Sequence, residues 1–161
     1  MSQWFDMWET ENPYSREHEQ LAELTASISM VAAVIEKEST AVGAQNVILG
    51  GISQGCATAI HALLQGQRRL GGFVGLSSWM PLRNEHDHSP ERNVALQTPV
   101  FLAHCQDDDV IAIGYGKELR DSLQLRGMSV EWNDYEEGGH WMNEPQGVDE
   151  LTVFLRRVLV R

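Results

Sequence analysis

Cysteine and long apolar runs are scarce in this sequence of 161 residues. Its two cysteines, Cys56 and Cys105, cannot form a disulfide framework for a chain of this size. The amino terminus has neither the basic segment nor the apolar segment of a secretory signal, so we expect a cytoplasmic protein. Residues 39–67 carry no Asp, Glu, Lys or Arg, but polar residues and glycines interrupt them, so we expect no membrane-spanning helix.

Positive charge is scarce as well. The sequence has 12 Lys and Arg against 23 Asp and Glu, which gives a formal net charge of −11. Such a chain offers no basic surface that releases counterions from phosphates, which excludes nucleic acid as a partner. Hydrophobic residues make up 42% of the sequence, and neither a repeat nor a low-complexity linker divides it. We therefore expect one folded domain over residues 1–161.

Strand-like and helix-like patterns alternate along the chain, which predicts an α/β protein with a mainly parallel sheet. Short apolar runs bounded by glycine or proline predict strands, and apolar residues at steps of three and four predict helices. The expected strands cover residues 46–49, 72–76, 99–103 and 128–132. The expected helices cover residues 15–38, 54–66, 115–123 and 145–158, and residues 83–97 form a polar loop.

Apolar stripes on the first and last helices are expected to face the core. The stripe of the first helix consists of Leu21, Leu24, Ile28, Val31 and Ile35, and that of the last helix of Val148, Leu151, Leu155 and Val158. The amino terminus is unusually apolar, with Trp4, Phe5, Met7 and Trp8. Since exposed aromatic surface is costly, we expect these side chains to pack on another element, most simply the first helix.

The strongest chemical signal is a G-x-S-x-G motif at residues 51–55, between an expected strand and an expected helix. In this context the motif predicts a nucleophile elbow, a tight turn that presents Ser53 above the sheet. We expect Gly51 and Gly55 to be required because a Cβ at either position would collide with the crossing backbone. The Gln54 N–H, at the positive end of the helix, is a donor for an oxyanion. The alternative is a glycine-rich turn with a capping serine.

A serine nucleophile needs a base and an acid that orients the base, and both types follow in the sequence. Asp107, Asp108 and Asp109 come after the expected strand at residues 99–103, and His140 comes after the next strand. The order Ser, Asp, His is that of α/β-hydrolases. Spacing alone does not choose among the three aspartates, for which a solvated acidic turn and a D-x-D metal site are the alternatives.

Five segments together resemble one known family. They are the motif at residues 51–55, LSSWMPL at 76–82, HCQDDDVI at 104–111, the Gly-His pair at 139–140, and the W-F-D segment at 4–6. In these features the sequence resembles the phospholipase/carboxylesterase family, which includes acyl-protein thioesterases and lysophospholipases. The resemblance implies an α/β-hydrolase-type three-layer fold. It also implies Ser53 as nucleophile, Asp108 as orienting acid and His140 as general base, with Gln54 as an oxyanion donor.

The sequence also departs from the family. Family members carry further strands ahead of the W-F-D segment, including a loop that supplies a second oxyanion donor. We therefore expect an amino-terminally truncated version of the fold. Cys56 and Cys105 stand where the family commonly has glycine. None of these departures removes a member of the expected triad.

The resemblance implies a serine hydrolase that cleaves carboxylic esters or thioesters without a metal or an organic cofactor. Its substrate would be an acylated protein, a lysophospholipid or a smaller ester. Trp79, Met80 and Trp141 are candidates for the acyl pocket, with core or rim packing as the alternative. The competing hypothesis is a catalytically impaired family member that acts as an interaction or dimerising module. An unpaired strand edge at residues 46–49 leads us to expect self-association, as in a homodimer.

Three further features have simple explanations. The His-Asp-His run at residues 86–88 has ligand types at close spacing, but a solvated loop is favoured over a metal site. Cys56 lies near a helix start, where thiols become reactive, yet Ser53 already occupies the elbow. His61 and His104 are expected to be packed or capping residues rather than catalytic ones.

Overall fold

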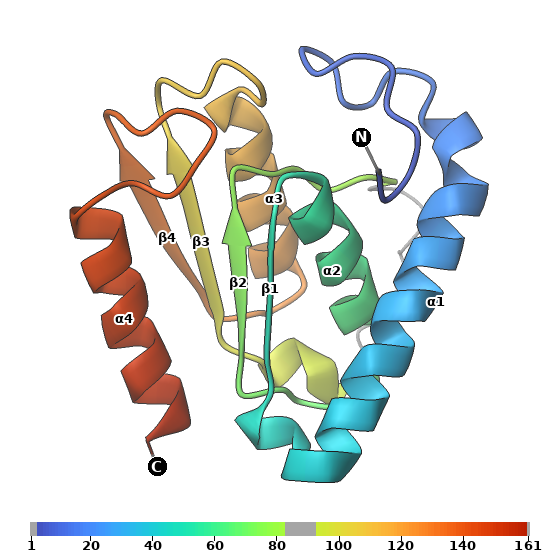
Figure 1. Cartoon of the computed structure of the whole chain (residues 1–161), viewed down its shortest axis with the longest axis vertical. Coiled ribbons are helices and arrows are strands. Elements are labelled where there is room, and N and C mark those ends of the chain that lie inside the picture. Colours follow the sequence, from blue (N-terminus) through green and yellow to red (C-terminus); the bar gives the residue numbers. More distant parts are fainter. Residues whose placement is uncertain (1–2, 83–92, 161) are drawn as a thin grey trace.

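One parallel sheet forms the centre of the protein, whose computed structural model describes residues 3–82 and 93–160 (Figure 1). Its four strands lie in the order of the sequence, and every neighbouring pair is parallel. They are β1 (Ile48–Ile52), β2 (Gly72–Leu76), β3 (Val100–Cys105) and β4 (Val130–Tyr135). The expected mainly parallel α/β fold is confirmed.

Helices cover both faces of this sheet, as expected for a parallel sheet whose crossovers run through helices. On one face lie α2 (Gln54–Gln65) and α3 (Ile113–Leu125), with α1 (Glu17–Val42) packed on α2. The opposite face carries α4 (Gln146–Leu159), seen in red in Figure 1. No helix in residues 3–82 and 93–160 combines the length and the apolar character needed to cross a membrane.

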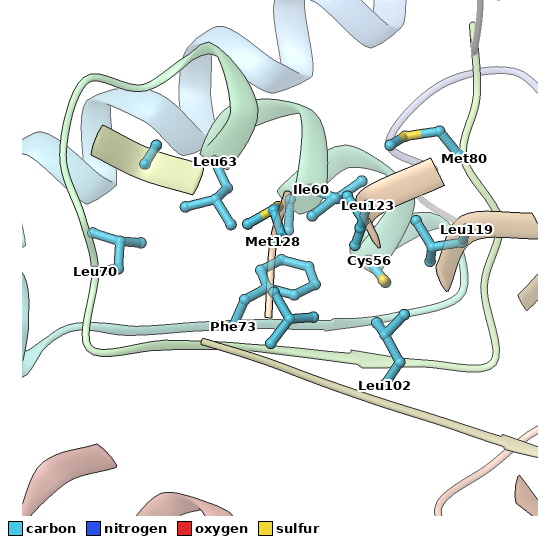
Figure 2. Close-up of a cluster of buried hydrophobic side chains, with 13 residues drawn as sticks. Cys56, Ile60, Leu63, Leu70, Phe73, Met80, Leu102, Leu119, Leu123 and Met128 are labelled. Carbon is cyan, nitrogen blue, oxygen red and sulfur yellow. The ribbon is translucent and has the colours of Figure 1, made fainter. Parts of the chain in front are cut away.

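Two buried clusters hold the layers together. Figure 2 shows Phe73 of β2 and Leu102 of β3 pointing toward the side chains of α2 and α3, including Ile60. Adjacent residues of a strand face opposite ways, and so Val74 and Phe101, the neighbours of Phe73 and Leu102, pack against α4. Continuous apolar runs in β2 and β3 are therefore buried on both faces of the sheet.

The ends of two elements differ from the sequence-based boundaries. The first helix continues to Val42 rather than ending at residue 38, and it stops at Gly43, whose φ of 86° favours glycine. The first strand is Ile48–Ile52 rather than residues 46–49, which is a correction of two to three residues. Gly50 and Gly51 are strand residues because they pair with β2, not turn residues.

Other boundaries need corrections of similar size. The strand expected at residues 128–132 is Val130–Tyr135, and β3 runs two residues beyond residue 103, because the two strands pair as far as Cys105 and Tyr135. The polar loop ends in a 3₁₀ turn, Val94–Gln97. Leu21 and Val148 are exposed rather than core residues, and Phe154 and Val158 form the buried side of the last helix.

The amino-terminal segment packs against α1, as expected. Phe5 is fully buried among Leu24 and Ile28 of α1, and its ring lies edge-on to Trp79 with centroids 6.2 Å apart. Trp4 and Trp8 stay partly exposed. The aromatic segment therefore lies on the α1 and α2 side of the sheet (Figure 1).

Within the described residues, β1 pairs on one side only, with β2. Its residues are half-buried apart from Gly50, which is exposed. The expected strand edge is thus present, although its residues are those of Ile48–Ile52.

Candidate active site

Ser53 occupies a strained turn between β1 and α2. Its backbone angles, φ 53° and ψ −127°, lie in a region that costs about 1–3 kcal/mol for a residue with a side chain. Three hydrogen bonds hold the turn: Ser53 N–H donates to Leu76 O (2.9 Å), and Ser53 O accepts from Ser78 Oγ–H (2.7 Å) and Ala57 N–H (3.0 Å). This is the backbone geometry expected of a nucleophile elbow.

The two glycines of the motif have different roles. A Cβ on Gly51 would lie 2.4 Å from the Cys56 backbone nitrogen, so only glycine fits there. A Cβ on Gly55 would meet only the Trp4 Nε1 atom, at 3.5 Å, which is an ordinary contact. The expectation that both glycines are required is therefore wrong for Gly55, because its Cβ position points from α2 toward the amino-terminal segment rather than toward the crossing backbone.

Gly51→Ala is expected to destabilise the fold and lower the reactivity of Ser53, whereas Gly55→Ala is tolerated. Overpacking a backbone contact of this kind costs about 1–3 kcal/mol, and the displaced atoms belong to the elbow itself. Urea unfolding and the rate of labelling by a fluorophosphonate measure the two effects. Equal behaviour of the two variants would contradict the assignment of the close contact to Gly51.

The first turn of α2 supplies backbone donors beside Ser53. The Gln54 N–H is one of the initial helix N–H groups that have no partner within the helix, at the positive end of its dipole. The Gln54 side chain is used elsewhere: its amide oxygen accepts from Trp4 N–H (3.1 Å) and its amide nitrogen donates to Phe5 O (2.8 Å). The same residue thus ties the amino-terminal segment to the elbow.

Asp108 differs from its two neighbours in burial and in its partners. Its Oδ1 atom accepts from Val110 N–H and Ile111 N–H, both at 2.9 Å, and its Oδ2 atom lies 2.9 Å from His140 Nδ1. Asp109 is exposed, and so is Asp107. The structure therefore brings one aspartate of the three into contact with His140.

The environment of Asp108 favours its charged form. Burial acts to raise the pKa of this carboxyl, but hydrogen bonds from Ile111 N–H, His140 and Val110 N–H outweigh burial. The net effect is a pKa below the usual value of aspartic acid. Asp108 is therefore an anion that can stabilise a positive charge on His140.

His140 lies in the loop between β4 and α4, where a second aspartate holds the backbone. Asp107 accepts from Gly138 N–H at 3.2 Å and from Gly139 N–H at 2.8 Å. Because a carboxylate only accepts hydrogen bonds, the proton of His140 is assigned to Nδ1, facing Asp108. The Nε2 atom then has a free lone pair, as a general base requires.

His104 also contacts Asp108, which no sequence motif indicates. It is fully buried at the end of β3, with Nε2 2.8 Å from Ile111 O and 3.1 Å from Asp108 Oδ2. Burial lowers the pKa of His104, and its contacts with Ile111 O and Asp108 offset this only in part. Its position four residues before Asp108 was the only signal in the sequence.

Acidification below about pH 6.5 is expected to lower the free energy of unfolding through His104. Its folded-state pKa lies below the ordinary histidine value of about 6.5, so the unfolded state binds a proton first as the pH falls. Proton binding then favours the unfolded state over the folded one. The slope from this one group is at most about 1.4 kcal/mol per pH unit. Urea unfolding between about pH 7.5 and 5, the range around histidine titration, should give a shallower slope for His104→Gln. Identical slopes would exclude His104 as the source.

The other candidates from the sequence take no part in the contact between Asp108 and His140. Trp79 and Met80 are fully buried in the core, so neither lines a surface groove, whereas Trp141 is 63% exposed. Burial raises the pKa of the Cys56 thiol to about 12, which makes it a poor nucleophile at neutral pH. His61 is buried, with Nε2 2.8 Å from Pro81 O.

The remaining candidate was the His-Asp-His run. Residues 86–88 lie outside the described residues. Elsewhere in the chain, within 3–82 and 93–160, no group of three or more His, Cys, Asp or Glu side chains has an arrangement that could hold a metal ion.

Comparison with known sequences yields consistent matches. A sequence model described as Phospholipase/Carboxylesterase matches residues 1–159. Acyl-protein thioesterase 1 of Yarrowia lipolytica is 34% identical over 139 residues, which are 84% of this chain and 60% of that protein. Acyl-protein thioesterase 1 of Candida albicans is 27% identical over 162 residues, or 99% of this chain and 70% of that protein. The chain thus spans only 60% of the length of the Yarrowia relative.

Solved structures share the fold. The crystal structure of Zea mays acyl-protein thioesterase 2 has a TM-score of 0.78 and 28% identity, and covers 98% of this chain and 72% of that chain. SOBER1 of Arabidopsis thaliana has a TM-score of 0.81 at 23% identity, covering 99% of this chain and 75% of that chain. The expected α/β-hydrolase-type arrangement is therefore confirmed.

Proposed function

The chain belongs to the phospholipase/carboxylesterase family, and we propose that it is a serine hydrolase of carboxylic esters or thioesters, with Ser53, Asp108 and His140 as its triad. The observation that carries the proposal is the 2.9 Å contact between Asp108 Oδ2 and His140 Nδ1. The strained backbone of Ser53 at the start of α2 supports it independently. Relatives named acyl-protein thioesterase support the thioester specificity.

The proposed reaction has two steps. In the first, Ser53 Oγ attacks the acyl carbonyl while His140 Nε2 takes the hydroxyl proton, and Asp108 stabilises the imidazolium. The oxyanion accepts a hydrogen bond from Gln54 N–H, and the leaving alcohol or thiol departs with the proton from His140. In the second step, water attacks the acyl-enzyme with the same base, which releases the carboxylic acid and restores Ser53.

The proposed substrate is an acylated protein or a lysophospholipid. Trp141 directly follows His140 and is exposed, so we assign to it the contact with the acyl chain. Cys56 and Cys105 are both free thiols, which fits a reducing compartment, and we propose a cytoplasmic location. The chemistry assigned to the triad needs no metal or organic cofactor.

A fluorophosphonate probe tests the proposal without knowledge of the substrate. The serine oxygen displaces fluoride from phosphorus, which needs an activated serine but no turnover. We expect a single labelled residue, Ser53, and no labelling of Ser53→Ala. Ser29→Ala is the matched control, because Ser29 is an exposed serine on α1 and should leave labelling unchanged. Labelling that persists in Ser53→Ala contradicts the proposal.

The alternative is an interaction or dimerising module without activity. It is favoured by one observation: within residues 3–82 and 93–160, β1 pairs only with β2, so its other edge can pair with another strand. The two hypotheses differ in two measurements. An inactive module leaves the probe unbound and is a dimer by light scattering, whereas the hydrolase is labelled in whichever assembly state it adopts.

A further inference from the structure

We propose that His104 is a positioning residue, which fixes the Asp108 carboxylate in the orientation that His140 requires. The proposal rests on the function proposed above and adds a residue to it. His104 does not contact the reacting atoms; it acts through Asp108.

Two hydrogen bonds and one close contact between His104, Ile111 and Asp108 are the basis for this role. Asp108 Oδ1 accepts from Ile111 N–H at 2.9 Å, Ile111 O accepts from His104 Nε2 at 2.8 Å, and His104 Nε2 lies 3.1 Å from Asp108 Oδ2. These contacts join the end of β3 to the loop that carries Asp108. Rotation of the carboxylate would break bonds at both of its oxygens.

The protonation of His104 follows from its partners. Its Nε2 atom faces a carbonyl oxygen and a carboxylate oxygen, which both accept, so Nε2 carries the proton. This N–H donates to Ile111 O, and Asp108 Oδ2 lies 3.1 Å from the same nitrogen. Asp108 Oδ2 therefore lies close to two imidazole nitrogens, His104 Nε2 at 3.1 Å from inside the fold and His140 Nδ1 at 2.9 Å from the loop. The side chain of Asp108 is fully enclosed, so a lost donor cannot be replaced easily by water.

His104 is buried and packs closely against Gly116 of α3. A Cβ on Gly116 of α3 would lie 2.3 Å from His104 Nδ1 and 3.0 Å from the Trp132 ring. Glycine at this point lets the imidazole approach the helix. Gly114, two residues earlier on α3, has open space at its Cβ position. Gly116→Ala therefore places a methyl group against His104, and Gly114→Ala is the matched control.

Four single variants test the proposal. His104→Leu removes the donor, and His104→Gln keeps a donor at a similar reach. Gly116→Ala displaces His104, and Gly114→Ala is its control. We expect His104→Leu and Gly116→Ala to lower kcat for a short ester by about tenfold to 100-fold, with KM little changed, because a displaced group loses alignment rather than binding. His104→Gln should restore most of kcat. Gly114→Ala should equal the unmodified chain.

A double-mutant cycle separates positioning from a general loss of structure. If His104 acts through Asp108, His104→Leu should cause no further loss in an Asp108→Asn background. A merely structural effect would multiply with that of Asp108→Asn. Additive free energies, or a His104→Leu variant as active as the unmodified chain, would overturn the proposal. Gly116→Ala and His104→Gln decide the question if His104→Leu does not fold.

A spectroscopic measurement distinguishes failure of this inference from failure of the proposed function. The N–H proton between His140 and Asp108 is followed by proton NMR and identified by its loss in His140→Ala. We expect its signal to move in His104→Leu and to return in His104→Gln. An unmoved signal overturns the role of His104. An unlabelled Ser53 together with a signal that moves overturns the hydrolase proposal instead and leaves the positioning of Asp108 intact.

Discussion

Ser53→Ala is expected to lower ester hydrolysis by this chain by roughly 10⁴-fold or more, the range seen when one triad member is removed from a serine hydrolase. The reason is that alanine has no oxygen with which to form the acyl-enzyme. Asp108→Asn and His140→Ala should each cause losses of similar order. Because the three groups act as one unit, the double and triple variants should lose little more than the single ones.

Turnover of a short p-nitrophenyl ester checks this, with controls that match each change. Asp109→Asn alters an exposed neighbour of Asp108, and His18→Ala alters an exposed histidine on α1; both should retain activity. Fully multiplicative losses in the double variants would mean that the residues act separately. Activity that survives in Ser53→Ala would assign the chemistry to another group.

The number and type of the elements could be predicted from the sequence because each has a strong local pattern. Where a boundary depended on a partner strand, the prediction failed. Gly50 and Gly51 have low strand propensity, and only their pairing with β2 and the close approach of Cys56 N make them strand residues. Likewise β4 extends to Tyr135 because it pairs with Cys105, which no local pattern reports.

In the candidate site, too, local patterns could be predicted and contacts between distant segments could not. The elbow context indicated Ser53, the order of the residues indicated His140, and the resemblance selected Asp108, because motifs record spacing along the chain. Burial and contacts between distant segments are not recorded in this way. Trp79 follows a strand end, as a pocket residue does, but Phe5 of the amino-terminal segment encloses it. His104 gains its role only when the Asp108 loop turns back onto β3.

The second large effect concerns the oxyanion. The 161-residue chain, tested as such, is expected to hydrolyse a short p-nitrophenyl ester about 10²–10³-fold more slowly than the full-length Yarrowia lipolytica relative, of which it spans 60%. In the family that the sequence resembles, a loop ahead of the W-F-D segment supplies a second donor to the oxyanion. The donor that we assign in this chain is Gln54 N–H. Loss of one donor costs about 2.7–4 kcal/mol of transition-state stabilisation.

Substrate length should add to this difference. Each methylene that is buried on binding contributes about 0.8 kcal/mol, so acyl-chain contacts from the part of the Yarrowia protein outside the matched 60% would favour long substrates in that protein. We expect a long-chain thioester to be disfavoured more strongly than the short ester in this chain, relative to the full-length protein. The comparison is kcat/KM for both substrates and both proteins, each normalised to the fraction of serine labelled by the fluorophosphonate.

Normalisation to the labelled serine separates two explanations for a slow chain. If only a small fraction folds with a competent elbow, the loss before normalisation is equal for both substrates. Normalisation to the labelled serine then removes it. A second donor in the Yarrowia protein instead leaves the loss in kcat for every labelled site, and extra acyl-chain contacts in that protein leave an additional difference in KM for the long chain alone. Equal normalised kcat/KM values for the long-chain thioester in the two proteins would mean that Gln54 N–H and the groups of residues 1–161 suffice, and that the second donor has no role.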